Sequence, residues 1–282
     1  MLSEAKHLIR CATILFISIR RLLPAARPAT IRKVVVEEVK TASVPEVAGL
    51  GQPSYVWRFG LERRLDLIRR HVPLQGRRIL DIGCGVGTFV QRLREFSPHV
   101  YGVDIDQERV RRGAMALPHL FVAVSEHLPF ADATFDVVLL HEVLEHVRDD
   151  RLTLGEACRV TKPRGKIVIY CPNRLYPFET HGIFLGKRYL FGNIPLVNYL
   201  PDGLRKRLVP HVRAYTRRGL RRLFAGLAAK PIVHTCIFPG FDNLAARSGL
   251  ASSILRRVVY PLENTPLSNF GLSHFVVLEK RG

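Results

Sequence analysis

The stretch that decides the fold is Leu80-Asp81-Ile82-Gly83-Cys84-Gly85-Val86-Gly87-Thr88-Phe89. The run that leads into it, from Arg78 to Ile82, is apolar enough for a buried parallel strand. Glycine at every second position of the following GxGxG lets the backbone turn sharply and approach a ligand closely. A second apolar run ends in Gly102-Val103-Asp104-Ile105-Asp106. The sequence therefore predicts a strand, a glycine-rich turn, a helix and a second strand that ends in acid.

The glycine spacing indicates which ligand this turn accepts. A dinucleotide-binding turn reads GxGxxG, holds a pyrophosphate at a helix N-terminus, and is followed about 20 residues later by an acid for the ribose hydroxyls. In this chain Asp104 supplies the ribose acid, but the phosphate-binding spacing is absent. A ligand with a ribose and a cationic amino group, and without phosphate, suits a turn with Asp81 at its mouth and Asp104 opposite. S-adenosylmethionine is such a ligand.

Further segments follow in a recognisable order, and together with the turn they resemble the class I S-adenosylmethionine-dependent methyltransferases over roughly residues 54 to 173. These segments are Leu128-Pro129-Phe130, the apolar run 135–140, His141-Glu142-Val143-Leu144-Glu145-His146-Val147, and residues 159–169. The resemblance implies an α/β fold: a Rossmann-like, seven-stranded, mostly parallel sheet with helices on both faces and an antiparallel final strand. It also implies that the cofactor is S-adenosyl-L-methionine.

The resemblance places cofactor contacts residue by residue. The glycines would form the floor under the methionine part, Asp81 would face its amino group, Asp104 would accept both ribose hydroxyls, and Ile105 would lie against the adenine. In the next loop the family often has an acid for the adenine amino group, whereas this chain has Val124, so the backbone of Ser125 or the side chain of Glu126 would replace it. The expected cofactor-binding set is Asp81, Gly83, Cys84, Gly85, Gly87, Asp104, Ile105, Ser125, Glu126 and His141.

Length and cysteine content agree with an intracellular enzyme-sized domain. The chain has 282 residues, of which 47% are hydrophobic, enough for a sizeable core. Its five cysteines form no CxxC pair and no metal-ligand grouping with histidine. Buried thiols in a reducing, cytoplasmic compartment are expected, and no metal site is predicted.

The net charge and the first 30 residues suggest that the protein binds an anionic partner. The 43 basic and 24 acidic side chains give a formal net charge of +19, which attracts polyanions such as nucleic acid, anionic lipid or acidic glycan. Residues 1–30 read as a basic amphipathic helix, and we expect residues 3–23 to bind an anionic membrane surface on the inner face of the membrane. A helix docked on the domain or on another subunit is the alternative. Residues 31–53 read as a linker.

The methyltransferase domain is expected to span residues 54–282, with insertions at about 174–212 and 239–272 that form a substrate cap. A helix from Tyr55 would pack through Leu61, Leu65, Ile68 and Val72, with Tyr55 or Trp57 closing the pocket and Arg63 reaching the methionine carboxylate. Runs 232–238 and 274–278 predict the final antiparallel strand pair. The stripe Leu250, Ile254, Val258 and Leu262 in the second insertion is expected to be core.

The acceptor would lie at the loop after the fifth strand, beyond the carboxyl ends of the strands. His181, Glu179 and Tyr176 in this loop, and His141, are the first candidates for a base or for positioning the acceptor, with His146 and His211 as further histidines. We expect methyl transfer to a small-molecule, lipid or glycan-type acceptor, with O-methylation favoured and carbon methylation as the other chemistry.

Two other functions remain open. An RNA methyltransferase is suggested by the net charge, but the Asn-Pro-Pro-Tyr type of motif is missing after the fourth strand, where the chain reads His141-Glu142-Val143-Leu144. A noncatalytic, cofactor-binding regulatory or scaffold protein is suggested by Val124 and by the lack of a clear base. The oligomeric state does not follow from the sequence.

Overall fold

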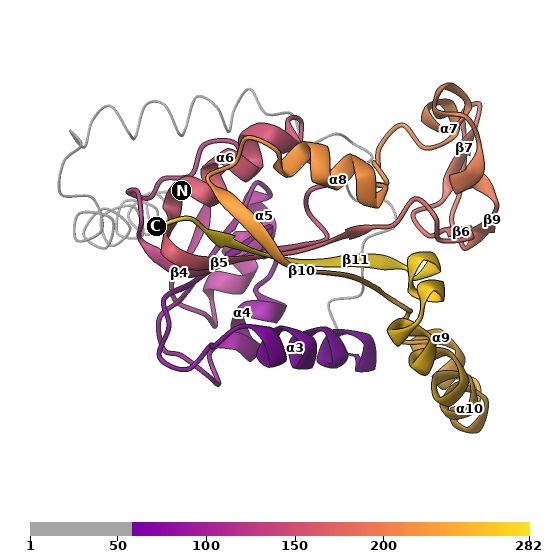
Figure 1. The fold of residues 1–282 in the computed structure, drawn as a ribbon, viewed down its shortest axis with the longest axis horizontal. Coiled ribbons are helices and arrows are strands. Elements are labelled where there is room, and N and C mark those ends of the chain that lie inside the picture. Colours follow the sequence, from indigo (N-terminus) through magenta and orange to yellow (C-terminus); the bar gives the residue numbers. More distant parts are fainter. Residues whose placement is uncertain (1–57) are drawn as a thin grey trace, which may run out of the picture.

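The computed structural model describes residues 58–282, and its centre is a seven-stranded sheet (Figure 1). The expected anchor at 1–30, the linker at 31–53, and Tyr55 and Trp57 lie outside the described residues. The strand order is β10-β11-β5-β4-β1-β2-β3. The strands are β1 (Ile79–Ile82), β2 (Val100–Asp104), β3 (Leu120–Val122), β4 (Phe135–His141), β5 (Thr161–Pro172), β10 (Ala229–Ile237) and β11 (Ser273–Lys280).

The direction of the strands confirms the predicted topology. Strands β3, β2, β1, β4 and β5 pair in parallel, whereas β11 runs antiparallel to both of its neighbours, β5 and β10. Every residue of β1 and of β2 is buried, as expected for central parallel strands covered on both faces. The parallel strands therefore carry their carboxyl ends to one edge of the sheet, where the glycine turn lies.

Helices cover both faces of the sheet (Figure 1). They are α3 (Phe59–His71), α4 (Thr88–Leu93), α5 (Gln107–Ala114), α6 (Asp150–Val160) and α8 (Arg217–Phe224). One core packs Leu65 of α3 and Val90 of α4 against the sheet, and the other packs Leu154 of α6 and Leu220 of α8 against the opposite face. The helix predicted from Tyr55 onward corresponds to α3, which buries Leu65 and Ile68 as expected.

Local sequence explains where several helices begin. The side chains of Asp106, Asp149 and Thr216 accept hydrogen bonds from backbone N–H groups in the first turns of α5, α6 and α8. Each cap satisfies donors that have no partner within the helix. Helix α4 instead follows Gly87, its N-cap residue, whose φ of 88° is accessible to glycine at little cost. Because of this conformation, α4 starts directly at the end of the turn.

The first insertion is more regular than the sequence indicated. Residues 174–212 show no strong periodicity, yet they form two small two-stranded sheets and a short helix. The elements are β6 (Phe178–Glu179), β7 (Ile183–Leu185), β8 (Arg188–Leu190), β9 (Ile194–Pro195), η1 (Val197–Tyr199) and α7 (Asp202–Leu208). Strands of two or three residues are too short for a period to be seen. The insertion has a separate small core of its own, made by Ile183, Val197, Val209 and Val212. We call residues 174–212 the lid.

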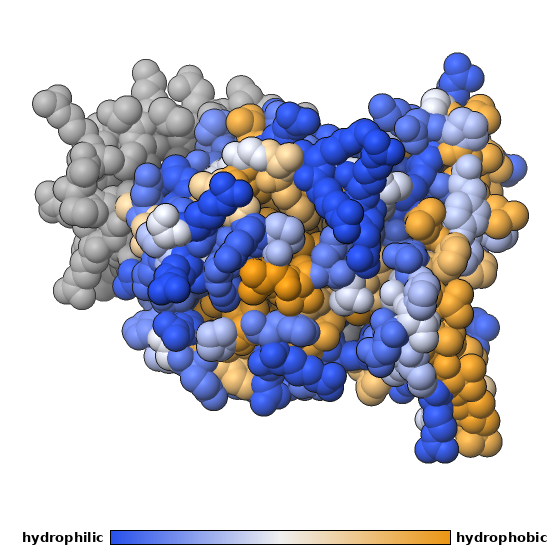
Figure 2. Space-filling model, in the orientation of Figure 1, coloured by the Kyte–Doolittle hydropathy of each residue, from blue (hydrophilic) through white to orange (hydrophobic). Residues whose placement is uncertain are grey.

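The second insertion overturns one expectation. Residues 239–272 contain α9 (Asp242–Ala245), α10 (Gly249–Val259), η2 (Tyr260–Asn264) and η3 (Pro266–Phe270). The helical stripe was expected to be core, but Leu250, Ile254 and Val258 are 74%, 56% and 62% exposed. Helix α10 projects from the end of the sheet and offers this stripe to solvent (Figures 1 and 2). Helical spacing specifies that a face is apolar, and only the packing specifies what covers it.

Candidate active site

The glycine turn connects β1 to α4 in a conformation that needs glycine. The φ angles of Gly83, Gly85 and Gly87 are 75°, 56° and 88°. A Cβ on Gly83 would lie 2.3 Å from Val143, and one on Gly87 would lie 2.5 Å from Leu117, so these two glycines permit close packing. A Cβ on Gly85 would meet no atom within 4 Å. Gly85 therefore borders open space at the carboxyl end of β1.

Two carboxylates flank this open space. Asp81 lies in β1 and is 2% exposed, and Asp104 ends β2 and is 9% exposed. The Asp104 carboxylate accepts hydrogen bonds from the backbone N–H of Gly85 at 2.7 Å and of Asp106 at 2.9 Å, which fixes the turn against the second strand. Burial, and then the negative charge of Asp104, raise the pKa of Asp81 well above its usual range. Burial also raises the pKa of Asp104.

This arrangement fits the cofactor that the resemblance implies. Two buried carboxylates that repel one another favour a cationic ligand between or beside them. The oxygens of Asp104 keep lone pairs beyond the two backbone bonds, since each carboxylate oxygen can accept more than one hydrogen bond. The open side of Gly85 leaves room for a ligand against the backbone. Asp81, Asp104 and Gly85 are thus brought together as the sequence predicted.

The loop after β3 is less clearly a binding element. The Oε1 atom of Glu126 accepts from the backbone N–H groups of Arg148 and Asp149, at 3.0 and 3.3 Å, and Oε2 accepts from the Ser125 hydroxyl at 3.0 Å. Glu126 therefore ties this loop to the start of α6. The adenine contact of Ser125 and Glu126, and that of the half-buried Ile105, stay predictions.

His141, at the end of β4, is held by a residue that the sequence analysis did not single out. Its Nε2 lies 2.8 Å from Nη1 of Arg64, which also donates to Glu142 at 2.7 Å. Because the guanidinium is always a donor, the Nε2 lone pair of His141 is engaged. Burial, and then Arg64, lower the pKa of His141 to about 3. Its geometry therefore suits positioning better than proton abstraction.

The contacts of Arg63 and Arg64 revise the expectation for α3. Arg63 forms an ion pair with Glu263 and donates to the carbonyl of Phe238, so it joins α3 to the second insertion. The arginine that faces the end of β4 is Arg64, and its Nη2 donates to Ser273 at 2.9 Å. The available signal was helical spacing, since Arg64 lies one turn before the buried Ile68, at the border of the apolar face of α3.

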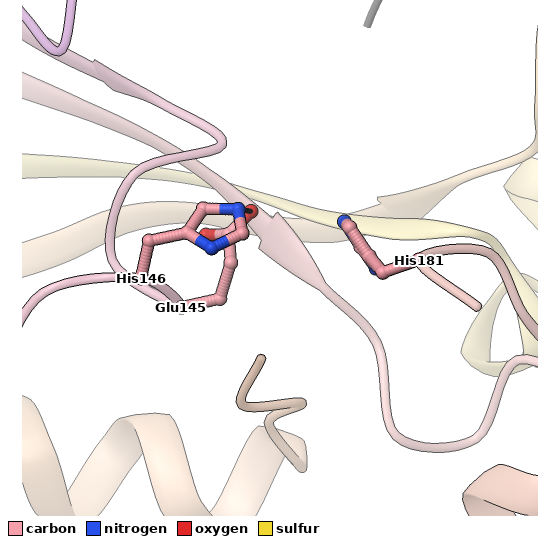
Figure 3. Close-up of side chains that lie close together, drawn as sticks. All are labelled: Glu145, His146 and His181. Carbon is pink, nitrogen blue, oxygen red and sulfur yellow. Dashed lines mark ion pairs between the residues drawn. The ribbon is translucent and has the colours of Figure 1, made fainter. Parts of the chain in front are cut away.

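A third group of side chains lies between the sheet edge and the lid. Glu145 and His146 come from the turn between β4 and α6, and His181 comes from the lid (Figure 3). Their ligand atoms all lie within 4.8 Å of one another, and His146 Nε2 is 3.9 Å from Oε1 of Glu145. Burial, and then Glu142, raise the pKa of Glu145 well above its usual range. Burial lowers the pKa of His146 to about 4.

Glu179 was a candidate base, but in the structure its carboxylate is occupied by contacts within the lid. It is 2% exposed, accepts from Nη2 of Arg205 at 2.7 Å, and contacts Nδ1 of His181 at 3.1 Å. Burial raises the pKa of Glu179, but the hydrogen bonds from His181 and the charge of Arg205 outweigh it and bring the pKa to about 2. Such a carboxylate is a weak base. It orients His181, whose backbone carbonyl contacts Nε2 of His211 at 3.1 Å.

The fold and the glycine turn define a Rossmann-like domain of the class I methyltransferase type. Residues 80–169 match the family model described as a methyltransferase domain. This region of the chain is thus similar to methyltransferase domains, as the glycine motif indicated. In fold it is similar to the S-adenosylmethionine-dependent methyltransferase from Mesorhizobium loti, with a TM-score of 0.57 and 16% identity over 80% of this chain and 100% of that chain.

Curated relatives match less than half of this chain. The chain is 31% identical over 142 residues to the ubiquinone biosynthesis O-methyltransferase of Aromatoleum aromaticum, covering 47% of this chain and 59% of that protein. It is 35% identical over 114 residues to the demethylmenaquinone methyltransferase of Corynebacterium urealyticum, covering 40% and 47%. The chain thus spans about half the length of the curated relatives it matches.

Proposed function

We propose that this chain is an enzyme that transfers a methyl group from S-adenosylmethionine to a small lipid-type acceptor, with a hydroxyl oxygen as the favoured methyl acceptor. The observation that carries the proposal is the open turn at Gly85, which donates to the buried carboxylate of Asp104, with the buried Asp81 close to Asp104. The names of the matched relatives, which refer to ubiquinone and demethylmenaquinone, support a quinone-like acceptor class.

The proposed roles follow from the site geometry. Asp81 would hold the amino group of the cofactor, Asp104 its ribose hydroxyls, and the backbone at Gly85 would lie under its methionine part. When bound, the cofactor supplies an already activated methyl group, so the protein mainly needs to orient the acceptor and exclude water. The lid and the second insertion stand at the same end of the sheet and would perform both tasks (Figure 1).

An anionic membrane surface is the proposed source of the acceptor. Besides the stripe on α10, exposed apolar side chains in the lid include Leu185, Leu190 and Phe191, which are 52%, 44% and 69% exposed. Figure 2 shows apolar side chains along α10 and over the lid at one end of the molecule. The net charge of +19 complements anionic headgroups. Within residues 58–282 no helix is long and apolar enough to cross a bilayer, so the proposed contact is interfacial.

Calorimetric titration of S-adenosylmethionine into two glycine variants tests the cofactor site. Gly85 and Gly76 have φ angles of 56° and 65°, and a Cβ on either would meet no atom within 4 Å. We expect Gly85→Ala and Gly76→Ala to lose a similar stability, about 1 kcal/mol, because alanine is strained at positive φ. Only Gly85→Ala is expected to lose cofactor affinity, by at least tenfold.

Equal affinity of the two variants would contradict the proposed site. A folded wild-type protein that does not bind the cofactor would contradict the enzyme proposal itself. Cofactor binding without methyl transfer to any lipid extract would favour the noncatalytic alternative. Methyl transfer to RNA, but not to lipids, would favour the RNA methyltransferase.

A further inference from the structure

The cluster of Glu145, His146 and His181 is not used by the cofactor site. Glu145 is 2% exposed, and neither of its carboxylate oxygens accepts a hydrogen bond from an N–H or O–H donor among the described residues. The carboxylate of Glu142 lies against it, and Glu142 is already paired with Arg64. A buried carboxylate without a donor or a counter-charge is costly. A bound cation would satisfy the Glu145 carboxylate in place of a proton shared with Glu142.

The two imidazoles are oriented for such a cation. The Nδ1 atom of His181 is held by Glu179 at 3.1 Å, so its Nε2 is the nitrogen left for another partner. A carboxylate that accepts the second ring N–H is the usual way in which a metal-ligating histidine is oriented. On the other side of the cluster, a hydrogen bond with the backbone of His211 holds the ring of His146. Figure 3 shows the His181 ring across a gap from His146 and Glu145.

We propose that Glu145, His146 and His181 bind a divalent first-row transition-metal cation such as Zn²⁺ or Mn²⁺. Two imidazole nitrogens and one carboxylate oxygen suit these ions, whereas Mg²⁺ and Ca²⁺ prefer oxygen ligands only. The ligand atoms lie within 4.8 Å of one another. Because metal–ligand distances are about 2.0–2.2 Å, binding needs a movement of about 1 Å, within reach of side-chain rotation. This proposal departs from the prediction of no metal, which rested on cysteine spacing.

The position of the site assigns the cation two roles. Because Glu145 and His146 belong to the sheet edge and His181 belongs to the lid, the cation would fasten the lid to the domain. Three protein ligands also leave a coordination position open. If the proposed function holds, the acceptor hydroxyl would occupy that position, and the cation would lower its pKa. The acceptor proton would then leave to water, so that no side-chain base is needed.

Metal titration of the full chain, stripped by a chelator and without added S-adenosylmethionine, tests the proposal. Calorimetry with Zn²⁺, Mn²⁺ and Mg²⁺ is compared for the wild type and for Glu145→Gln, His146→Ala and His181→Ala. The control is His99→Ala, because His99 is an exposed histidine outside the cluster. We expect one Zn²⁺ or Mn²⁺ per chain in the wild type and in the control, and affinity at least 100-fold weaker in the three variants. Glu145→Gln removes a buried charge with little change of shape, so it is the variant most certain to fold.

Hydrogen exchange supplies a readout that does not depend on activity. Metal is expected to slow exchange in residues 178–190 of the wild type and to leave exchange in His181→Ala unchanged. Equal metal affinity in the wild type and the three variants, no binding of Zn²⁺ or Mn²⁺, or binding of Mg²⁺ alone would each overturn the proposal. Cofactor affinity measured on the same samples separates the two ideas. Intact cofactor binding without metal binding contradicts only the metal site, and the reverse result contradicts only the proposed function.

Discussion

At the scale of single residues, the most constrained side chains are polar groups buried beside the sheet. His274 in β11 is 1% exposed, with Nε2 2.9 Å from the carbonyl oxygen of Tyr215 and Nδ1 3.1 Å from Sγ of Cys236. The bond to a carbonyl requires a proton on Nε2, so in the neutral ring Nδ1 is the acceptor. The hydrogen bonds of the folded protein therefore require the neutral form of His274.

Stability is expected to decrease in mild acid because of this residue. Burial lowers the pKa of His274 to about 4, whereas the unfolded value is about 6.5. The unfolded chain therefore takes up a proton first, so the contribution is complete above about pH 6.5 and is lost as the pH falls toward 4. The expected loss at about pH 5 is on the order of 2 kcal/mol in the free energy of unfolding.

Urea unfolding near pH 7.5 and near pH 5 measures this effect. His274→Gln should reduce the pH dependence by roughly 2 kcal/mol, and His99→Gln, at an exposed position, should leave it unchanged. Burial, and then the neighbouring His274, lower the pKa of His234 to about 3, so His234 adds its own share to the pH dependence of the wild type and of His99→Gln. A pH dependence that is identical in wild type and His274→Gln would contradict the assignment.

At the scale of elements, the lid is stabilised by one buried ion pair as well as by its small apolar core. Arg205 of α7 is 4% exposed and bonds to Glu179 at 2.7 Å, to Oδ1 of Asn198 at 3.1 Å and to the carbonyl of Val212 at 2.9 Å. These contacts join residues from β6 to the end of the lid. Short strands and a short helix have little stability alone, so this network specifies their arrangement.

Removing one member of this pair is expected to open the lid. Arg205→Met would leave the Glu179 carboxylate buried without its arginine counter-charge, a change that costs about 3–5 kcal/mol. Hydrogen exchange of residues 178–212 should increase, while exchange of β1 and β4 should remain slow. The double variant Glu179→Gln with Arg205→Met should recover much of the protection, because no charge is then left buried. Arg207→Met, at an exposed position of the same helix, is the control. Equal exchange in the Arg205 and Arg207 variants would argue against the anchoring role.

At the scale of the whole molecule, apolar surface and positive charge occur together. The α10 stripe of Leu250, Ile254 and Val258 is exposed, and Arg247 and Arg257 beside it are exposed as well. Full burial of an aliphatic side chain contributes about 1.5–3 kcal/mol. Replacing all three stripe residues by serine should therefore reduce binding to anionic vesicles by at least tenfold, and salt should weaken the binding of the wild type.

Vesicle sedimentation measures this binding. The control replaces two exposed apolar residues outside the stripe: Met115 at the end of α5, which is 85% exposed, and Leu152 in α6, which is 53% exposed. We expect the control to bind as the wild type does. Equal binding of the stripe variant would place membrane contact elsewhere, with residues 3–23 as the remaining candidate. Failure of the wild type to bind vesicles would contradict an interfacial enzyme.

Local sequence signals were sufficient to predict the central sheet and its glycine turn. Buried apolar runs specified the strands, alternate glycines specified the turn after β1, and the acid at Asp104 specified the end of β2. These signals are local: burial on both faces produces a continuous apolar run, and positive φ requires glycine over a few residues. Asp81, Gly85 and Asp104, the residues proposed to bind the cofactor, were predicted from the same short stretch and lie close together in the structure.

The tertiary structure alone decided which distant residues meet and which faces remain uncovered. Arg64 reaches His141 and Ser273, and His181 of the lid faces Glu145 and His146, although no spacing along the chain relates these positions. The α10 stripe has the period of a core helix, yet it is exposed. Periodicity records the chemistry of a face within one element, whereas contacts between elements depend on how the whole chain packs.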